Sequence, residues 1–361
     1  MTTCSCKLLE EKVIYSGGWY PNALFDSKGN IIVGIRKKPE SLTIYSKDGG
    51  TTWEQAATHV MDISSCHILS DGTVLVFKPQ NVIQDKVRLE QEQKPFIGWI
   101  RRAKSLEDLI DGIYVDDFVK MSIPDLSGTH GDSENYCLGG IDHGVVELPN
   151  GDLVITLYGR FRQDVIKVPY YPEGAYQYRS WTCISKDRGN SWNYLQTLGA
   201  NEIALLPERS EGYCEPDMIV LHDNTLLSVM RTGGSSYKGS PERYTHLCTV
   251  QSENGGATWS LPVPIYPYGV WPRLLKMSNG VIVCASGRPG VFLLFSTDGG
   301  KTWSKPEIVT DFDDDWNRCS SGYNSIGESS PGVLTLLYDD VDRNDENREH
   351  FTKMRKYRIE I

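Results

Sequence analysis

The 361-residue sequence has no apolar run long enough to cross a bilayer, and its first residues are polar rather than apolar. It therefore predicts neither a membrane span nor a secretory signal. We expect a cytoplasmic location, with a secreted protein that has lost its leader as the alternative. Basic residues are also in deficit, because 37 Lys and Arg face 47 Asp and Glu for a formal net charge of −10. That balance argues against nucleic acid and against an anionic membrane as partners.

Motifs for metals and nucleotides are missing as well. No group of His, Cys and Asp has the spacing of a metal site, and no glycine-rich loop is placed to hold a nucleotide. We therefore expect no metal and no cofactor. The nine cysteines are scattered, several of them within strand-like segments, which indicates buried free thiols rather than a disulfide framework. None of these features indicates an oligomeric state.

One short pattern, Ser-x-Asp/Asn-x-Gly-x-Ser/Thr-Trp, is present in four copies, at residues 46–53, 185–192, 252–259 and 296–303. Each residue type in it has a local role. Asp or Asn accepts hydrogen bonds from nearby backbone N–H groups, Gly supplies a positive φ, and Trp buries a large ring. Each copy is therefore predicted to be a rigid turn with a hydrophobic anchor, and the repetition predicts a repeat architecture.

Short apolar segments joined by Asn-Gly or Asp-Gly turns form a second repeat along the chain. Clear examples run over residues 67–77, 145–155 and 274–283, and the rhythm recurs six times. Apolar runs joined in this way are typical of β-hairpins. The sequence therefore predicts an all-β fold made of six hairpins.

The four copies resemble the Asp boxes (BNR repeats) of the sialidase superfamily and of related β-propellers. This resemblance implies a single domain over residues 1–361, a six-bladed β-propeller with four-stranded antiparallel blades. Two blades lack a good box, and the segment 103–109 is interpreted as a degenerate remnant of one. We expect residues 12–15 to pair with the last strand, near 353–359, and so to close the ring.

Charged and aromatic residues recur where the predicted inner strands begin and end. At strand starts these are Trp19, Asp142, His143, Glu215, Trp271, Arg273 and Tyr323, and at the ends of second strands they are Arg36, Arg231, Arg288 and Asp339. Inner strands of a propeller converge on one centre, so the recurrence over successive blades favours a shared ligand pocket. A solvent-exposed rim would explain any one of these residues alone.

Comparison with sialidases gives several of these residues possible roles. Glu215 and Arg231 resemble the family's blade-four Glu and Arg, Arg288 its blade-five Arg, and Tyr323 its nucleophile. Asp339 stands where a Glu braces the first arginine of the family. A Tyr hydroxyl is a weak nucleophile near its usual pKa of about 10, so a neighbouring carboxylate must take its proton. The arginines would bind an anionic group of the substrate.

Two family positions differ in this chain. Trp19 replaces the first arginine, and the stretch between Arg36 and Ser46 contains Glu40 but no Asp to act as acid/base. These differences set the chain apart from sialidases with the full residue set, and a related glycosidase activity is the broader expectation.

Exo-arabinanases, which share the predicted fold, suggest another arrangement. Asp142 and Glu215 would then flank one sugar ring as acid/base and as nucleophile or base, with Trp19 and Trp271 stacking on sugar faces. The separation of the two carboxylates would decide between retention and inversion. His143 is a further acid/base candidate, and a packing role is its alternative.

The sequence as a whole predicts an exo-acting, sialidase-like glycoside hydrolase that removes a terminal, anionic sugar, with a carbohydrate as its partner. Two alternatives remain open. A polysaccharide lyase would use Tyr323 and either His143 or His67 to abstract a proton, while Arg288 would neutralise the uronate. A non-catalytic glycan-binding propeller would use the same pocket without turnover.

Overall fold

The computed structural model describes residues 4–37, 40–56, 65–78, 96–123, 126–128, 144–161, 163–168, 176–204, 206, 210–222, 224–233, 246–288, 290–310, 320–341 and 349–361. Within them the fold is almost wholly β. One short helix, α2 (Leu106–Ile110), lies among the strands. No helix in these ranges is long and apolar enough to span a membrane.

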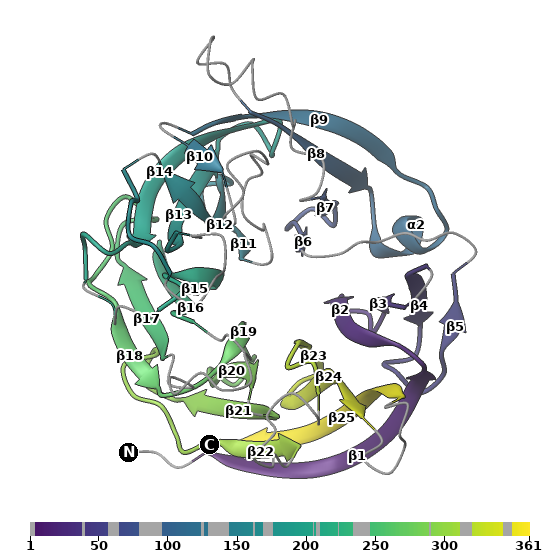
Figure 1. Ribbon diagram of the computed structural model, residues 1–361. Helices are drawn as coiled ribbons and strands as arrows, with labels where there is room; N and C mark the ends of the chain where they lie inside the picture. The colour runs from purple at the N-terminus through teal and green to yellow at the C-terminus, as the bar shows by residue number, and fades with distance from the viewer. Residues whose placement is uncertain are drawn as a thin grey trace.

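Four antiparallel sheets contain four strands each. In strand order they are β2 (Trp19–Phe25), β3 (Ile31–Arg36), β4 (Leu42–Ser46) and β5 (Glu54–Gln55); β15 (Cys214–His222), β16 (Thr225–Arg231), β17 (Leu247–Ser252) and β18 (Val263–Tyr266); β19 (Val270–Lys276), β20 (Ile282–Gly287), β21 (Val291–Ser296) and β22 (Glu307–Thr310); and β23 (Asn324–Ser330), β24 (Val333–Val341), β25 (His350–Glu360) and β1 (Ser5–Ser16). Figure 1 shows the sheets around a common centre, with the first strand of each hairpin nearest to it.

The fifth sheet has nine strands and combines two antiparallel sets. Its members are β6 (Ser65–Ile68), β7 (Val74–Lys78), β8 (Phe96–Ala103), β9 (Val115–Ser122), β10 (Leu126–Gly128), β11 (Val145–Glu147), β12 (Leu153–Phe161), β13 (Arg179–Ser185) and β14 (Ser191–Gly199). The outer strands β14 and β9 pair in parallel, with Trp192 opposite Met121. The propeller-like arrangement agrees with the prediction, but this fusion departs from six separate sheets, so the count of six stays a prediction.

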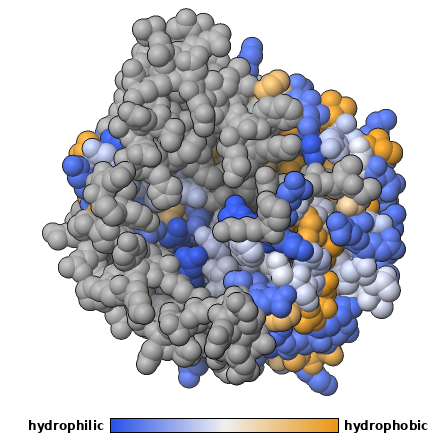
Figure 2. All heavy atoms as spheres, turned by 45° about the vertical axis from the view of Figure 1, so that its right-hand side comes forward, coloured by the Kyte–Doolittle hydropathy of each residue, from blue (hydrophilic) through white to orange (hydrophobic). Residues whose placement is uncertain are grey.

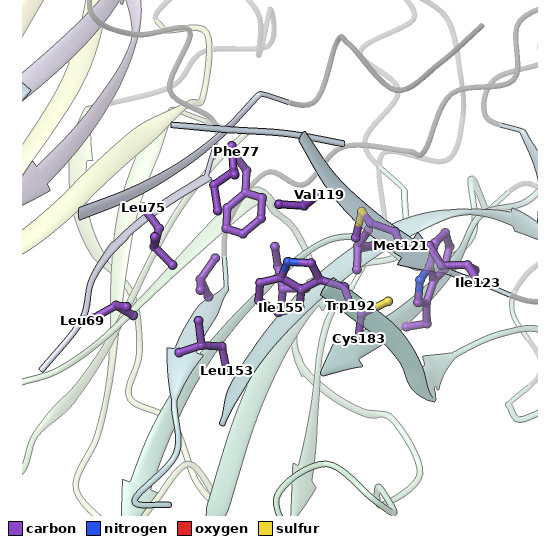
Figure 3. Packing of buried hydrophobic residues seen from close by; sticks show 14 of the residues in the cluster. Leu69, Leu75, Phe77, Val119, Met121, Ile123, Leu153, Ile155, Cys183 and Trp192 are labelled. Carbon is purple, nitrogen blue, oxygen red and sulfur yellow. The ribbon is translucent and has the colours of Figure 1, made fainter. Parts of the chain in front are cut away.

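The fused sheet is held by a core between its two halves. Figure 3 shows Phe77, Val119 and Met121 from one half facing Ile155 and Trp192 from the other. The Trp192 side chain is 0% exposed. A ring of this size, fully buried, contributes about 2–3 kcal/mol. Burial of this box tryptophan explains why strands β9 and β14 meet.

The predicted turn geometry is confirmed in the Asp boxes. The Ser46 hydroxyl accepts the N–H of Gly50 at 2.8 Å, Asp48 accepts the N–H of Thr52 at 2.9 Å, and the Trp53 indole N–H donates to the Gly50 carbonyl at 3.0 Å. The other three boxes repeat these bonds. Hydrogen bonds from Thr52 and Ser46 hold the pKa of Asp48 well below its usual range. The boxes are structural turns between third and fourth strands.

The segment 103–109 occupies the same place, between β8 and β9, but adopts a different conformation. It forms α2, whose N-cap Ser105 accepts the N–H of Asp108 at 3.0 Å. Leu106 and Leu109 are buried against β7 and β8. The position of a missing box was therefore predicted, whereas its helical form was not.

The ring closes as predicted. Strand β1 pairs antiparallel with β25, and Lys12 lies opposite Met354. The two ends of the described chain accordingly lie close together in Figure 1. Exposed apolar side chains are found on outer strands, among them Leu8 on β1 and Val115 and Phe118 on β9. On the face in Figure 2, hydrophobic atoms form separate spots among hydrophilic ones.

Candidate active site

Three inner strands begin with the same unusual backbone. Tyr20, Glu215 and Trp271 have φ angles of 62°, 49° and 51°. Each is followed by a proline, and strand pairing is interrupted there by a bulge. Non-glycine residues in this conformation are uncommon and strained, and such residues cluster at functional sites. The repeated bulge brings these three residues toward one cluster at the centre.

An aromatic cluster forms where these strands begin. The Tyr20 and Tyr323 rings stack with centroids 3.8 Å apart, and Trp271 meets them edge-on at 5.0 and 4.6 Å. The guanidinium of Arg36 lies 4.9 Å from the Tyr20 ring, and that of Arg288 lies 5.2 Å from the Tyr323 ring. Cations over aromatic faces are attracted by about 0.5–2 kcal/mol. Two of the predicted arginines therefore flank the predicted nucleophile.

A buried ion cluster adjoins the aromatic rings. Arg231 donates two hydrogen bonds to the Glu215 carboxylate, at 2.6 and 3.0 Å, and a third to Glu211 at 2.6 Å. The carboxylate of Glu215 also accepts the backbone N–H of Trp271 at 2.8 Å. Although burial opposes charge, the anionic groups around Arg231 raise its pKa well above the usual value. Two buried carboxylates thus bind one buried arginine.

Asp339 organises a second polar cluster. Its side chain is 0% exposed and accepts hydrogen bonds from the Ser321 backbone at 2.8 Å, from the Ser321 hydroxyl, and from His350 Nδ1 at 2.9 Å. The His350 ring lies 5.6 Å from that of Trp19. Where the family has a carboxylate bracing an arginine, this chain therefore has Asp339 bracing a histidine beside a tryptophan.

Arg273 belongs to a further group of residues at the centre. Its Nε lies 3.8 Å from Asp217, which also accepts the N–H of Leu274 at 2.6 Å. Burial raises the pKa of Asp217, although Arg273 opposes the shift. Burial raises the pKa of the Cys66 thiol on β6 as well, and the positive charge of Arg273 opposes that shift. Among the described residues, Arg273 therefore pairs with Asp217 on β15.

A close backbone approach joins the sheets beside Arg288 and Tyr323. A Cβ on Gly287 would lie 2.3 Å from Cα of Gly322. Only glycine at residue 287 lets β20 come this near to the residues before β23. The two glycines hold the Arg288 and Tyr323 side chains side by side.

The structure brings together most of the predicted site residues that it describes. Glu215, Arg231, Trp271 and Tyr323 form one connected group, and the side chains of Arg36 and Arg288 border it. Asp142 and His143 lie outside the described residues, so the predicted pairing of Asp142 with Glu215 stays a prediction.

Two predicted roles need correction. Trp271 was expected to stack on a sugar, but its ring is 1% exposed and packs on the tyrosines instead. Asp339 was expected to contact substrate or brace an arginine, but it is fully buried and positions Ser321 and His350.

His67 was named as a base for the lyase alternative. Burial lowers the pKa of His67 to about 4, which keeps that residue neutral near pH 7.

Sequence reasoning missed Tyr20, Glu211 and His350. The first had a visible signal, because Tyr20-Pro, Glu215-Pro and Trp271-Pro repeat at equivalent strand starts. The other two had none: Glu211 lies before β15, and His350 begins β25, where no motif marks it in the sequence. Within the described ranges, no group of three or more His, Cys, Asp and Glu is arranged to hold a metal ion.

Sequence comparisons identify repeats and one partial relative. The BNR/Asp-box repeat family matches residues 44–55 and 294–305, which belong to the first and fourth boxes. A sialidase from Bacteroides fragilis is 26% identical over 180 residues, covering 42% of this chain. The match takes in only 32% of that sialidase, so the chain spans about a third of its length.

Solved structures with the same fold include proteins of different activities. A protein of unknown function from Dyadobacter fermentans matches with a TM-score of 0.70 at 15% identity, over 98% of this chain and 99% of that one. An α-L-arabinofuranosidase from Fusarium graminearum matches at 0.61 and 12% identity, over 97% and 98%. A sialidase from Streptococcus pneumoniae matches at 0.54 and 13% identity, over 98% and 69%. The chain thus has the Asp-box repeats and the fold of the sialidase-like superfamily.

Proposed function

We propose that this protein is a sialidase-like exo-glycoside hydrolase that removes a terminal, anionic sugar from a glycan. The observation that carries the proposal is the meeting of Tyr323 and Glu215 around Trp271, with Arg36 and Arg288 at the border of the same cluster. Fold alone does not determine chemistry, so the argument depends on these residues. The sialidase and arabinofuranosidase relatives support a glycosidase at the level of the superfamily.

The chemistry follows from the residue types. The Tyr323 oxygen attacks the anomeric carbon while its proton passes to a carboxylate, for which Glu215 is the family's counterpart. Arg288, whose Nε donates to the Ser321 carbonyl at 3.1 Å, supplies a guanidinium that binds an anionic substituent of the sugar. Arg36 is exposed and supplies a second cation on the opposite side of the stacked tyrosines. Water then attacks the glycosyl–Tyr323 bond and releases the sugar.

A neutral terminal sugar is the second candidate, and one observation favours it. Arg231 is already bound by two buried carboxylates, so its cluster does not offer a free positive charge to a substrate carboxylate. A furanoside such as arabinofuranose would not require that charge. The lyase and the non-catalytic glycan-binding protein remain the alternatives outside hydrolysis.

The proposal also includes the finer architecture. We infer that the nine-stranded sheet counts as two blades joined through β9 and β14, which makes six blades and one domain over residues 1–361. A cytoplasmic location stays part of the proposal.

The test is the release of methylumbelliferone from glycosides of sialic acid, glucuronic acid and arabinofuranose. Tyr323→Phe should lower the turnover of the preferred glycoside by about 10²-fold or more, because the nucleophilic oxygen is lost. Glu215→Gln should do the same. Tyr45→Phe is the matched control, since its hydroxyl binds Glu54 on the outer part of another sheet, and it should retain activity.

The identity of the preferred glycoside separates the candidates. Turnover of a sialoside or glucuronide supports an anionic sugar, and turnover of the arabinofuranoside alone supports the neutral one. Formation of an unsaturated uronate from a uronate-containing glycan, without release of methylumbelliferone, would indicate a lyase. Binding of glycans without any turnover would refute the hydrolase.

A further inference from the structure

The hydrolase proposed above needs a proton donor for the leaving group, and the described residues point to one that the sequence comparison did not supply. Sialidases carry their acid/base Asp in the stretch that corresponds to residues 37–45, and Glu40 is the only acidic residue of that stretch in this sequence. His350 begins β25 and lies beside Trp19, the residue that replaces the family's first arginine. We propose that His350, oriented by Asp339, transfers the proton between the enzyme and the glycosidic oxygen.

Hydrogen bonding fixes the orientation of the imidazole. Both carboxylate oxygens of Asp339 accept hydrogen bonds from Ser321, one from its N–H and one from its hydroxyl, so Asp339 acts as an acceptor toward His350 as well. Nδ1 of His350 must therefore donate to it, at 2.9 Å. This leaves Nε2 as the ring atom that exchanges a proton with a ligand. The His350 side chain is 30% exposed, whereas Asp339 is fully buried, so only the histidine can meet a substrate.

Ser321 connects His350 to the nucleophile. Its hydroxyl binds Asp339 and accepts the N–H of Tyr323 at 3.3 Å, and its carbonyl accepts Nε of Arg288 at 3.1 Å. Along the chain, Trp19 precedes Tyr20, which stacks on Tyr323. His350 is thus linked to Tyr323 in two ways. One link runs through Asp339 and Ser321, and the other through Trp19 and Tyr20. Two groups positioned by one framework can act on opposite sides of a single glycosidic bond.

The proposed reaction has two halves. The glycosidic C–O bond breaks, its electron pair goes to the leaving oxygen, and that oxygen takes the proton from Nε2 of His350. The anomeric carbon bonds to the Tyr323 oxygen. In the second half, the oxygen of a water bonds to the anomeric carbon, and the bond from that carbon to the Tyr323 oxygen breaks with its electron pair on the Tyr323 oxygen. His350 takes a proton from that water and returns to its starting state, while the Tyr323 oxygen regains its proton from the carboxyl group of Glu215. One water is consumed: its hydroxyl group is on the released sugar, and its other proton replaces the one that His350 gave to the released alcohol.

Comparing two leaving groups tests this role. The glycoside found in the first screen is used as its methylumbelliferyl derivative, whose leaving group departs without protonation, and as its methyl derivative, whose leaving group requires a proton. His350→Gln is the chosen variant, because the Gln amide still donates to Asp339 but does not transfer a proton. We expect it to lose about 10²-fold or more on the methyl glycoside and only a few-fold on the methylumbelliferyl one. Asp339→Asn should show the same split, to a smaller degree.

His222→Ala is the control, a histidine on the exposed end of β15. It should leave both rates unchanged. An equal loss on both glycosides in His350→Gln would indicate a structural role and overturn the proposal, as would the absence of any loss. A wild type that turns over neither glycoside would instead refute the proposed function, and this role with it. Urea unfolding of each variant shows whether a loss of rate comes from a loss of folded protein.

Discussion

Replacing Arg231 by Met should destabilise the protein more than any comparable change at its surface. Arg231 lies between Glu211 and Glu215, each of which is 3% exposed, and it donates all three of its hydrogen bonds to them. Methionine has a similar length but no charge, so the buried carboxylates of Glu211 and Glu215 would lose the hydrogen bonds and the positive charge of Arg231. Breaking a buried ion pair by removing one partner costs about 3–5 kcal/mol. With two carboxylates affected, the upper part of this range is expected.

Arg188 offers a matched control. It also binds two carboxylates, those of Glu147 and Asp71, but its side chain is 41% exposed. Exposed ion pairs contribute about 0–1 kcal/mol. The assay is urea unfolding followed by tryptophan fluorescence at one pH and salt concentration, for wild type, Arg231→Met and Arg188→Met. If Arg231→Met lost no more free energy of unfolding than Arg188→Met, the argument that the central cluster depends on a compensated buried charge would be wrong.

Three further changes test other features. Burial lowers the pKa of His67 to about 4 in the folded protein, from 6.5 in the unfolded chain. Between pH 6.5 and pH 4, His67 therefore binds a proton in the unfolded chain but not in the folded protein. Stability should therefore fall by up to about 3 kcal/mol as the pH drops through this window, and His67→Gln should remove that part of the dependence measured by urea unfolding. Asp187→Ala removes the acceptor of one Asp box and should cost about 1–3 kcal/mol, whereas the neighbouring Lys186→Ala should cost almost nothing in the same assay. Gly287→Ala places a Cβ 2.3 Å from Gly322 and should lower the thermal midpoint, with a cost of about 1–3 kcal/mol. An unchanged midpoint would contradict the close approach of the two strands.

Local patterns made much of the fold predictable. The Asp boxes depend on hydrogen bonds between residues two to four positions apart, such as Ser46 with Gly50, so their geometry is written in eight consecutive residues. Ring closure was predictable because the resemblance to β-propellers led us to expect the segment near Lys12 to pair with the last strand, as it does. Fusion of β9 with β14 had no such signal, since it depends on the packing of Trp192 against a sheet formed by distant residues.

Candidate site residues were predictable by type and place but less so by role. Glu215, Arg231 and Tyr323 were identified at strand ends, and the structure connects them through Trp271. The exposure of these side chains could not be predicted from their positions at strand ends. Trp271, for example, is buried because it packs against Tyr20, which lies on another sheet. His350 was missed for a similar reason, since its partner Asp339 lies on the neighbouring strand.

Pairing of β1 with β25 also has a kinetic consequence. Ser5 lies opposite Glu360, so the sheet that contains the first strand cannot be completed until the last strand has been synthesised. Until then β1 exposes an unpaired edge, and Leu8 and Val13 on it are apolar. Contacts this distant in sequence slow folding and prolong exposure to aggregation. We therefore expect the slowest step of refolding to be the docking of β1, and backbone amides of β1 and β25 to exchange hydrogen together in native conditions.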